Sequence, residues 1–171
     1  MRAVLAALVC WLAFPVATQA EFIDAELRVD GMACPFCAFG IEKKLRAVEG
    51  VRDLEVRLDE GIIELGFEAD SPATVERLEK AVKAAGFGLG RLQLTVRGTL
   101  LADSSSPTLD AGGGGRFLLL EENDGRLRPI AAGTEATIRR TSANGVVVVR
   151  GEVHRHKDSL PGLVIGGGDD P

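Results

Sequence analysis

Two cysteines separated by two residues carry the clearest chemical potential in this sequence. Cys34 and Cys37 lie within GMACPFC, directly before a stretch with helical periodicity. Thiolates are stabilised at the start of a helix, because its unpaired N–H groups and its dipole attract negative charge. Two adjacent thiolates suit a soft cation such as Cu(I) or Hg(II), and the same pair could undergo thiol–disulfide exchange. Metal binding, redox exchange and a structural disulfide are therefore the three alternatives.

The number of cysteines bears on these alternatives. A secreted disulfide scaffold would carry several more cysteines, and the short loop between Cys34 and Cys37 constrains little of the unfolded chain. A structural zinc site needs a full set of ligands, and the sequence offers no second close cysteine pair. The count disfavours both a structural disulfide and a structural zinc site.

The first 20 residues, MRAVLAALVCWLAFPVATQA, predict a secretory signal. They combine a positive start, an apolar run and small residues before a cleavage position after Ala20. The run is shorter than the roughly 20 apolar residues of a membrane-spanning helix, so an uncleaved anchor is the less favoured alternative. Cys10 would leave with the signal, and the exported chain would keep only Cys34 and Cys37. We therefore expect a periplasmic or secreted protein that meets an oxidising compartment.

The elements around the cysteines follow a β-α-β-β-α-β order over residues 21–97. EFIDAELRVD predicts a half-buried strand that leads into the cysteine loop. Ile41 and Leu45 recur at helical spacing behind Cys37, and Gly50 is expected to cap this helix. VRDLEVRLDEGIIELGFE then predicts a hairpin with its turn at DEG.

A second helix and a last strand complete this part. In SPATVERLEKAVKAAGFG, Ser71 is expected to cap the helix, Pro72 to take its first position and Gly86 to end it. LGRLQLTVRG supplies the last strand. Two helices on one face of a four-stranded antiparallel sheet form the split β-α-β arrangement, so the expected fold class is α+β, with a ferredoxin-like domain over residues 21–97.

The second half of the chain shows no convincing helix and predicts a small all-β domain over residues 98–160. Strand candidates are residues 93–101, 117–121, 126–131, 136–140 and 146–156. NDG at 123–125 and ANG at 143–145 predict hairpin turns, while SSSP and GGGG mark a long flexible loop. Short strands in this number predict an OB-like barrel or a sandwich, and the strand around Leu94 could be shared between the halves. Residues 161–171 are expected to be a flexible tail.

The cysteine loop and its surroundings resemble the heavy-metal-associated domain family. The Gly-Met-x-Cys-x-x-Cys motif of that family is matched by Gly31, Met32, Cys34 and Cys37. Its continuation IxxxLxxxxGV is matched by Ile41, Leu45, Gly50 and Val51. AAGF at 84–87 matches the glycine–aromatic pair before the last strand, so the resemblance covers roughly residues 22 to 95. The family includes copper chaperones, metal-binding domains of copper-transporting ATPases and periplasmic mercury-binding proteins.

The resemblance implies roles for individual residues. Cys34 and Cys37 would be the metal ligands, for Cu(I) in the first place and Hg(II) or another thiophilic metal otherwise. Ala33 favours Cu(I) or Hg(II) over zinc, because zinc-preferring relatives often carry an acidic residue at its position. Met32 would pack under the loop and Phe87 would shield the site, with simple core packing as the alternative for both. The partner would be a metal-donor or metal-acceptor protein, including a membrane transporter.

The residues between the cysteines favour a rival interpretation. CPFC resembles the redox centre of thioredoxin-like proteins, and an oxidising compartment would close Cys34 and Cys37 into a disulfide. A thioredoxin-like fold needs a parallel crossover and a proline loop after the motif. Here the helix leads directly into a hairpin, and residues 73–100 contain no proline. Thiol–disulfide exchange therefore remains the alternative function of the same pair, within a metal-domain fold.

No other group of residues predicts a stronger site. Glu152, His154 and His156 alternate and would share one face of a strand, where they could bind Cu(II), zinc or nickel; a solvated surface is the default. The sequence shows no nucleophile–base pair, no phosphate loop and no basic block. We therefore expect no enzyme, no small-molecule substrate and no nucleic-acid partner. The predicted function is binding and transfer of a soft metal ion by an exported protein.

Overall fold

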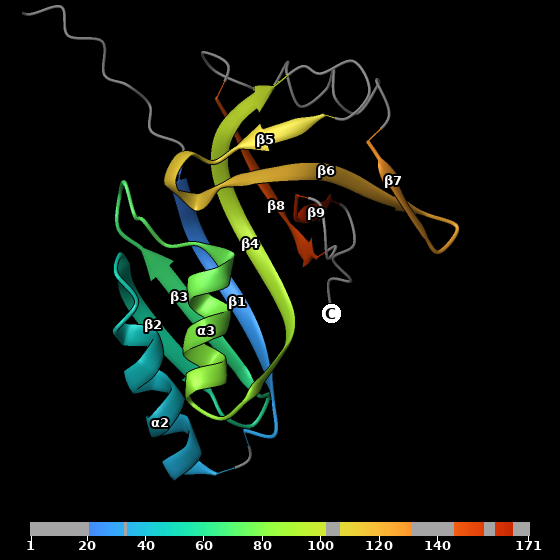
Figure 1. Ribbon diagram of the computed structural model, residues 1–171. Helices are drawn as coiled ribbons and strands as arrows, with labels where there is room; N and C mark the ends of the chain where they lie inside the picture. The colour runs from blue at the N-terminus through green and yellow to red at the C-terminus, as the bar shows by residue number, and fades with distance from the viewer. Residues whose placement is uncertain (1–20, 33, 102–106, 131–145, 156–159, 166–171) are drawn as a thin grey trace, which may run out of the picture.

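The computed structural model describes residues 21–32, 34–101, 107–130, 146–155 and 160–165 (Figure 1). Its first part comprises β1 (Glu21–Asp30), α2 (Pro35–Arg46), β2 (Val51–Arg57), β3 (Ile62–Phe67), α3 (Val75–Ala84) and β4 (Gly88–Leu101). Its second part comprises β5 (Thr108–Asp110), the 3-10 helix η2 (Gly112–Gly114), β6 (Arg116–Asn123), β7 (Arg126–Pro129), β8 (Val146–His154) and β9 (Gly162–Ile165). Within the described ranges, no helix has the length and apolar character needed to cross a membrane.

The first part is a four-stranded antiparallel sheet with both helices against one face. The strand order is β2-β3-β1-β4, and α2 and α3 lie on the same side of the sheet (Figure 1). Side chains alternate along the strands, so that the helix-facing ones, such as Leu27, Leu65 and Leu94, are buried. The ferredoxin-like arrangement predicted for the residues around the cysteines is confirmed.

The strand β4 belongs to both parts of the chain. One of its edges pairs with β1 and then with β5, and the other edge pairs with β8. The boundary predicted between residues 97 and 98 therefore falls inside a continuous strand. Both halves share this strand, as was considered for the strand around Leu94. Gly98 allows the close crossing of β5, because a Cβ at this position would lie 2.5 Å from the carbonyl oxygen of Asp110.

The second part is mostly β, as predicted, and its strand pairings close a ring. β4 pairs with β5, β5 with β6, β6 in parallel with β9, β9 with β8, and β8 again with β4. The predicted NDG turn joins β6 to β7, and Asp124 and Gly125 have positive φ angles of 52° and 69°, which a type I′ turn requires. The strand predicted over 136–140 and the ANG turn at 143–145 lie outside the described residues.

Residues expected to be flexible form regular structure in the second part. Gly162–Ile165 are strand β9 rather than the start of a tail, because Leu163 and Val164 are buried where β9 pairs with β6 and β8. The loop expected around GGGG contains β5 and η2. Gly114 packs on the ring of Phe22, and a Cβ there would lie 2.6 Å from a ring carbon, so only glycine fits.

Two predicted helix caps, Gly50 and Ser71, do not cap helices, whereas Gly86 follows the end of α3 as predicted. α2 ends at Arg46, and Gly50, with a φ of 88°, turns the chain toward β2 instead of capping the helix. α3 begins after Thr74, whose hydroxyl accepts a hydrogen bond from a backbone N–H of the first turn. Ser71 is buried three residues earlier against Gly50 and is not the cap. The reason is that Thr74 directly precedes the apolar helix face, whereas Ser71 is used in packing the preceding loop.

The hydrophobic cores of the two parts are continuous through Phe22. This side chain is 1% exposed; its ring centroid lies 5.7 Å from that of Phe67 in β3 and 6.0 Å from that of Phe117 in β6. The neighbouring Glu21 carboxylate forms an ion pair with Arg97 of β4. One buried cluster therefore extends from the helices of the first part into the strands of the second.

Candidate metal centre

The two cysteines are positioned by the loop between β1 and the start of α2. Cys34 has an extended backbone and is the N-cap, with Pro35 as the first helical residue and Cys37 in the first turn. The N–H of Ala38 donates to the carbonyl oxygen of Cys34 at 3.0 Å and closes this turn. Gly31, with a φ of 80°, reverses the chain after β1 in a conformation that residues with a Cβ rarely adopt. The predicted placement of the cysteines in the loop and in the first helical turn is confirmed.

Both thiols are free and partly exposed, and they interact with each other. The backbone N–H of Cys37, followed by its thiol, holds the pKa of the Cys34 thiol below its ordinary value, because both donate to the thiolate. The hydrogen bond to Cys34 raises the pKa of the Cys37 thiol, and burial adds to this effect. The geometry thus favours one thiolate beside one thiol, and two soft sulfur donors fit a thiophilic cation.

Alkylation of the reduced chain is expected to modify Cys34 faster than Cys37 at neutral pH. Only the thiolate reacts, and a lowered pKa leaves a larger fraction of Cys34 deprotonated. The advantage should shrink as the pH rises and Cys37 is deprotonated as well. Iodoacetamide labelling between about pH 5 and pH 9, followed by peptide mass spectrometry, measures both rates. Equal rates across this range would contradict the assignment of the thiolate to Cys34.

Two residues expected near the site are part of the core. Met32 is 3% exposed and lies within the main buried cluster, as expected for a side chain that packs under the loop. Phe87 is half-buried and packs against the same cluster. It directly precedes Gly88, which pairs with Asp30 at the end of β1, so Phe87 lies at the same end of the sheet as the cysteine loop.

The start of α2 also exposes two phenylalanine rings. Phe36 is 90% and Phe39 is 69% exposed, more than any other large apolar side chain of the described residues. The opposite face of the helix is buried through Ile41 and Leu45. The sequence patterns described above do not predict a role for Phe39. Its spacing of three residues from Phe36, away from the face formed by Ile41 and Leu45, nevertheless places both rings on one exposed face.

The second site considered from the sequence is only partly within the described residues. Glu152 and His154 lie on the same face of β8, with the imidazole Nε2 3.6 Å from a carboxylate oxygen. Glu152 also pairs with Arg91 at 3.4 Å, and His156 lies outside the described residues. In the described part of the chain, no group of three or more His, Cys, Asp or Glu side chains is arranged to hold a metal ion.

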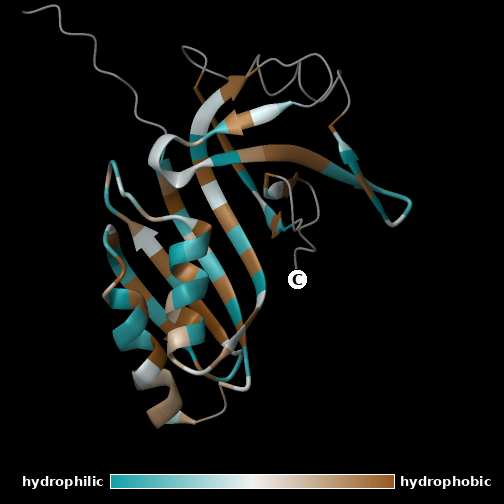
Figure 2. Ribbon diagram, in the orientation of Figure 1, coloured by the Kyte–Doolittle hydropathy of each residue, from teal (hydrophilic) through white to brown (hydrophobic). Residues whose placement is uncertain are grey.

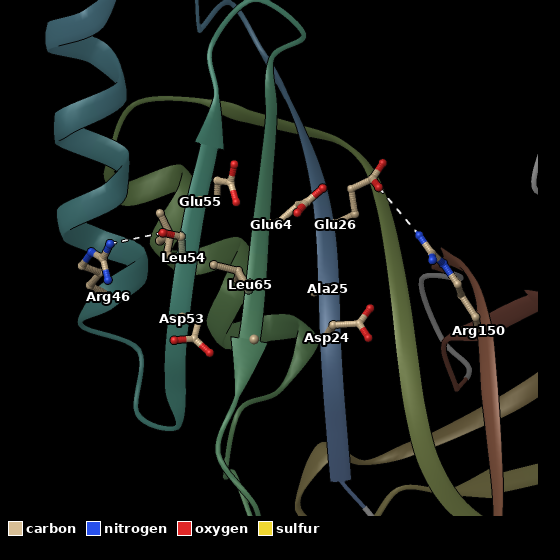
Figure 3. Close-up of a pocket in the computed structure, with 11 residues that line it drawn as sticks. Asp24, Ala25, Glu26, Arg46, Asp53, Leu54, Glu55, Glu64, Leu65 and Arg150 are labelled. Carbon is tan, nitrogen blue, oxygen red and sulfur yellow. Dashed lines mark hydrogen bonds and ion pairs between the residues drawn. The ribbon is translucent and has the colours of Figure 1, made fainter. Parts of the chain in front are cut away.

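A hollow of about 580 Å³ lies on the sheet face opposite the helices (Figure 3). Its acidic lining residues are Asp24, Glu26, Asp53, Glu55 and Glu64. At its two ends, Arg150 of β8 pairs with Glu26 at 3.7 Å and Arg46 of α2 donates to the carbonyl oxygen of Leu54 at 3.2 Å (Figure 3). The second part of the chain therefore completes one wall of an acidic surface that begins on the first part.

Known proteins are similar in sequence to the first part. Residues 26–88 match the family model of the heavy-metal-associated domain. The "COP-associated protein" of Helicobacter felis is 38% identical over 65 residues, which are 38% of this chain and 96% of that protein. The chain belongs to the heavy-metal-associated domain family. The predicted resemblance is thereby confirmed, and the matched residues include both cysteines.

Further relatives share this heavy-metal-associated domain. "Copper chaperone CopZ" of Staphylococcus epidermidis is 33% identical over 61 residues, 36% of this chain and 88% of that protein. "Mercuric reductase" of Acidithiobacillus ferrooxidans is 38% identical over 69 residues, 40% of this chain but 12% of the reductase. The chain thus spans almost all of the small relatives and a minor fraction of the large one. The family match ends where β4 begins, so β5 to β9 lie beyond it.

Proposed function

We propose that this protein binds a soft metal ion through Cys34 and Cys37 and passes it to a partner protein. The observation that carries the proposal is the pair of free, partly exposed thiols at the start of α2, one of them with a lowered pKa. Cu(I) is the first candidate, because relatives are named copper chaperone, COP-associated protein and "Copper-transporting ATPase 2". Hg(II) is the second, because a mercuric reductase carries a similar domain.

Transfer would proceed by exchange of thiolates around the ion. Two protein thiolates leave room for a third ligand, so a thiolate of the partner can bind before either cysteine leaves. The sulfur that is released, Cys34 or Cys37, takes up the proton that the partner's thiol gave up, and no electron is transferred. The N–H groups at the start of α2 stabilise the departing thiolate, and its partial exposure gives the partner access. This function is binding and transfer, not enzymatic turnover.

The alternative function is thiol–disulfide exchange by the same residues. The thiolate of Cys34 would attack a disulfide of a partner and form a mixed disulfide. Cys37 would then displace the partner, so that the pair becomes a disulfide and the partner is reduced. The CPFC sequence and the expected oxidising compartment support this alternative.

The location of the protein and the role of its second part complete the proposal. Export to the periplasm or beyond rests on the secretory signal predicted in residues 1–20, which lie outside the described residues. The ring of β4, β5, β6, β9 and β8 supports the interpretation of the second part as an OB-like barrel. Because both parts share β4, such a barrel would present a fixed surface to a metal donor, acceptor or transporter.

A competitive titration separates metal transfer from disulfide exchange. The reduced chain, residues 21–171, is titrated with Cu(I) against a chromophoric chelator, and one-to-one binding is expected. The oxidised chain is expected to leave all Cu(I) on the chelator, because a disulfide offers no thiolates. Absence of binding by the reduced chain, together with a reduction potential above about −200 mV, would overturn metal transfer in favour of disulfide exchange.

A further inference from the structure

The exposed phenylalanines of α2 belong to a stripe that continues into positive charge. Phe36, Phe39 and Lys43 are spaced by three and four residues, which places them on one face of the helix. All three are exposed. The helix begins at one end of the molecule, and this end is hydrophobic in Figure 2, whereas the following turns are hydrophilic. The stripe is therefore apolar at its tip and cationic behind it.

The helix layer around this stripe is basic, although the chain has a net charge of −5. The basic side chains of α2 and α3 are Lys43, Lys44, Arg46, Arg77, Lys80 and Lys83. Of the three acidic residues on these helices, Glu42 pairs with Arg46 and Glu79 pairs with Arg155. The four lysines are exposed and form no ion pair with a described residue. On the opposite face of the sheet, arginines pair with three of the five carboxylates of the hollow, Glu26, Asp53 and Glu64, whereas the unpaired lysines lie on the helix face.

We propose that this face docks the protein on an anionic lipid bilayer. The rings of Phe36 and Phe39 would enter the headgroup region, and the lysines behind them would lie at the lipid phosphates. Aromatic rings in front of free cations match the chemistry of such an interface, in which apolar burial and attraction to anionic lipid add. Because the unpaired lysines lie on α2 and α3, the same attraction orients the protein with its helices toward the membrane.

A lipid surface fits these residues better than a protein does. The rings project from the tip of a helix, and a fluid bilayer accommodates such a shape without a complementary recess. The apolar area consists of two side chains, and the next residues along the stripe are cations rather than further apolar side chains. A stable protein interface normally buries roughly 800 Å² of surface on each partner, and its apolar centre is larger than two side chains.

Docking in this way would place the metal loop at the membrane surface. Cys37 lies between Phe36 and Phe39 in the first turn of α2, so insertion of the rings brings both thiols to the headgroup region. An ion carried there would be next to any transporter embedded in the bilayer. The docking itself does not require the metal, because neither the phenylalanines nor the lysines are part of the thiol pair.

Vesicle flotation with residues 21–171 tests the proposal, and every described core residue lies within this chain. The probe is phosphatidylcholine vesicles with about 30% phosphatidylglycerol, compared with phosphatidylcholine alone. We expect binding to the anionic vesicles that weakens with salt. The double variant Phe36→Ser/Phe39→Ser should lower the partition coefficient at least about tenfold, and Lys43→Gln/Lys44→Gln should lower it about fivefold or more.

Two control variants keep the result specific. Val148→Ser removes an exposed apolar side chain on β8, 57% exposed, and should leave vesicle binding unchanged. Cys34→Ser/Cys37→Ser should also bind vesicles normally while losing Cu(I), so failure of the metal proposal and failure of the lipid proposal are distinguishable. Equal partitioning of the wild type and the phenylalanine variant would overturn lipid docking. Absence of vesicle binding by the wild type would also overturn it. If the phenylalanine variant then transferred metal to a soluble acceptor more slowly than the wild type, the face would be assigned to a protein partner instead.

Discussion

Replacement of both cysteines, Cys34→Ser and Cys37→Ser, is expected to lower the Cu(I) affinity of the reduced chain by at least about a thousandfold. Thiolate sites bind metals with about 10–16 kcal/mol when four ligands act together, so each sulfur contributes a factor of roughly a hundred or more. Serine keeps the volume and polarity of the side chain but offers a hard, protonated oxygen to a soft cation. Competition with a chelator at constant pH measures the change in affinity. Each single variant, Cys34→Ser or Cys37→Ser, should already lose most of the Cu(I) affinity.

Met32→Leu is the matched control for this experiment. Met32 is the third sulfur-containing side chain near the loop, and it is buried in the core. Leucine preserves its volume, so stability should change by less than about 1.5 kcal/mol and Cu(I) affinity should hardly change. A large loss of affinity in Met32→Leu would make the thioether a ligand and would contradict a site built from the two thiols alone. Unchanged affinity in the double cysteine variant would contradict the site altogether.

Phe22→Ala is expected to destabilise the chain by about 3 to 5 kcal/mol and to affect both parts equally. The ring of Phe22 contacts Phe67 in the first part and Phe117 in the second, and Gly114 packs against it. Removal of the ring leaves a cavity at the junction of the two parts, which cannot close without moving β4. Both parts should therefore unfold in one transition, at a lower denaturant concentration than in the wild type.

Hydrogen exchange resolved by peptide checks this prediction. Peptides from α2 and α3 and peptides from β6 and β9 should lose protection by the same free energy in the variant. Phe22→Leu, with a smaller loss of about 1 to 2 kcal/mol, serves if the alanine variant does not fold. Val148→Ala, at an exposed position, is the matched control and should leave stability within about 0.5 kcal/mol. Loss of protection confined to β6 and β9 would instead divide the chain into two independent domains.

The sequence by itself determined the local elements of the first part and the position of its thiols. The alternation of EFIDAELRVD and the helical spacing of Ile41 and Leu45 each depend on neighbouring residues, because a strand or a helix face is defined within a few residues of chain. The same holds for the turn at NDG, where Asp124 and Gly125 adopt the positive φ angles of the turn. The motif GMACPFC identified the loop, and the family match over 26–88 agrees with it.

Only the tertiary structure decided how the two halves are joined. Short stretches such as LVI in β9, or TLD in β5, carry too little periodicity to be told from loops, and they become strands because partners distant in sequence pair with them. Tertiary packing also decided which side chains of α2 stay exposed, so Ile41 is buried under the sheet while Phe36 and Phe39 face outward. Local patterns fix what a segment can form; the burial of one segment against another, across Phe22 and along β4, fixes which surfaces remain exposed.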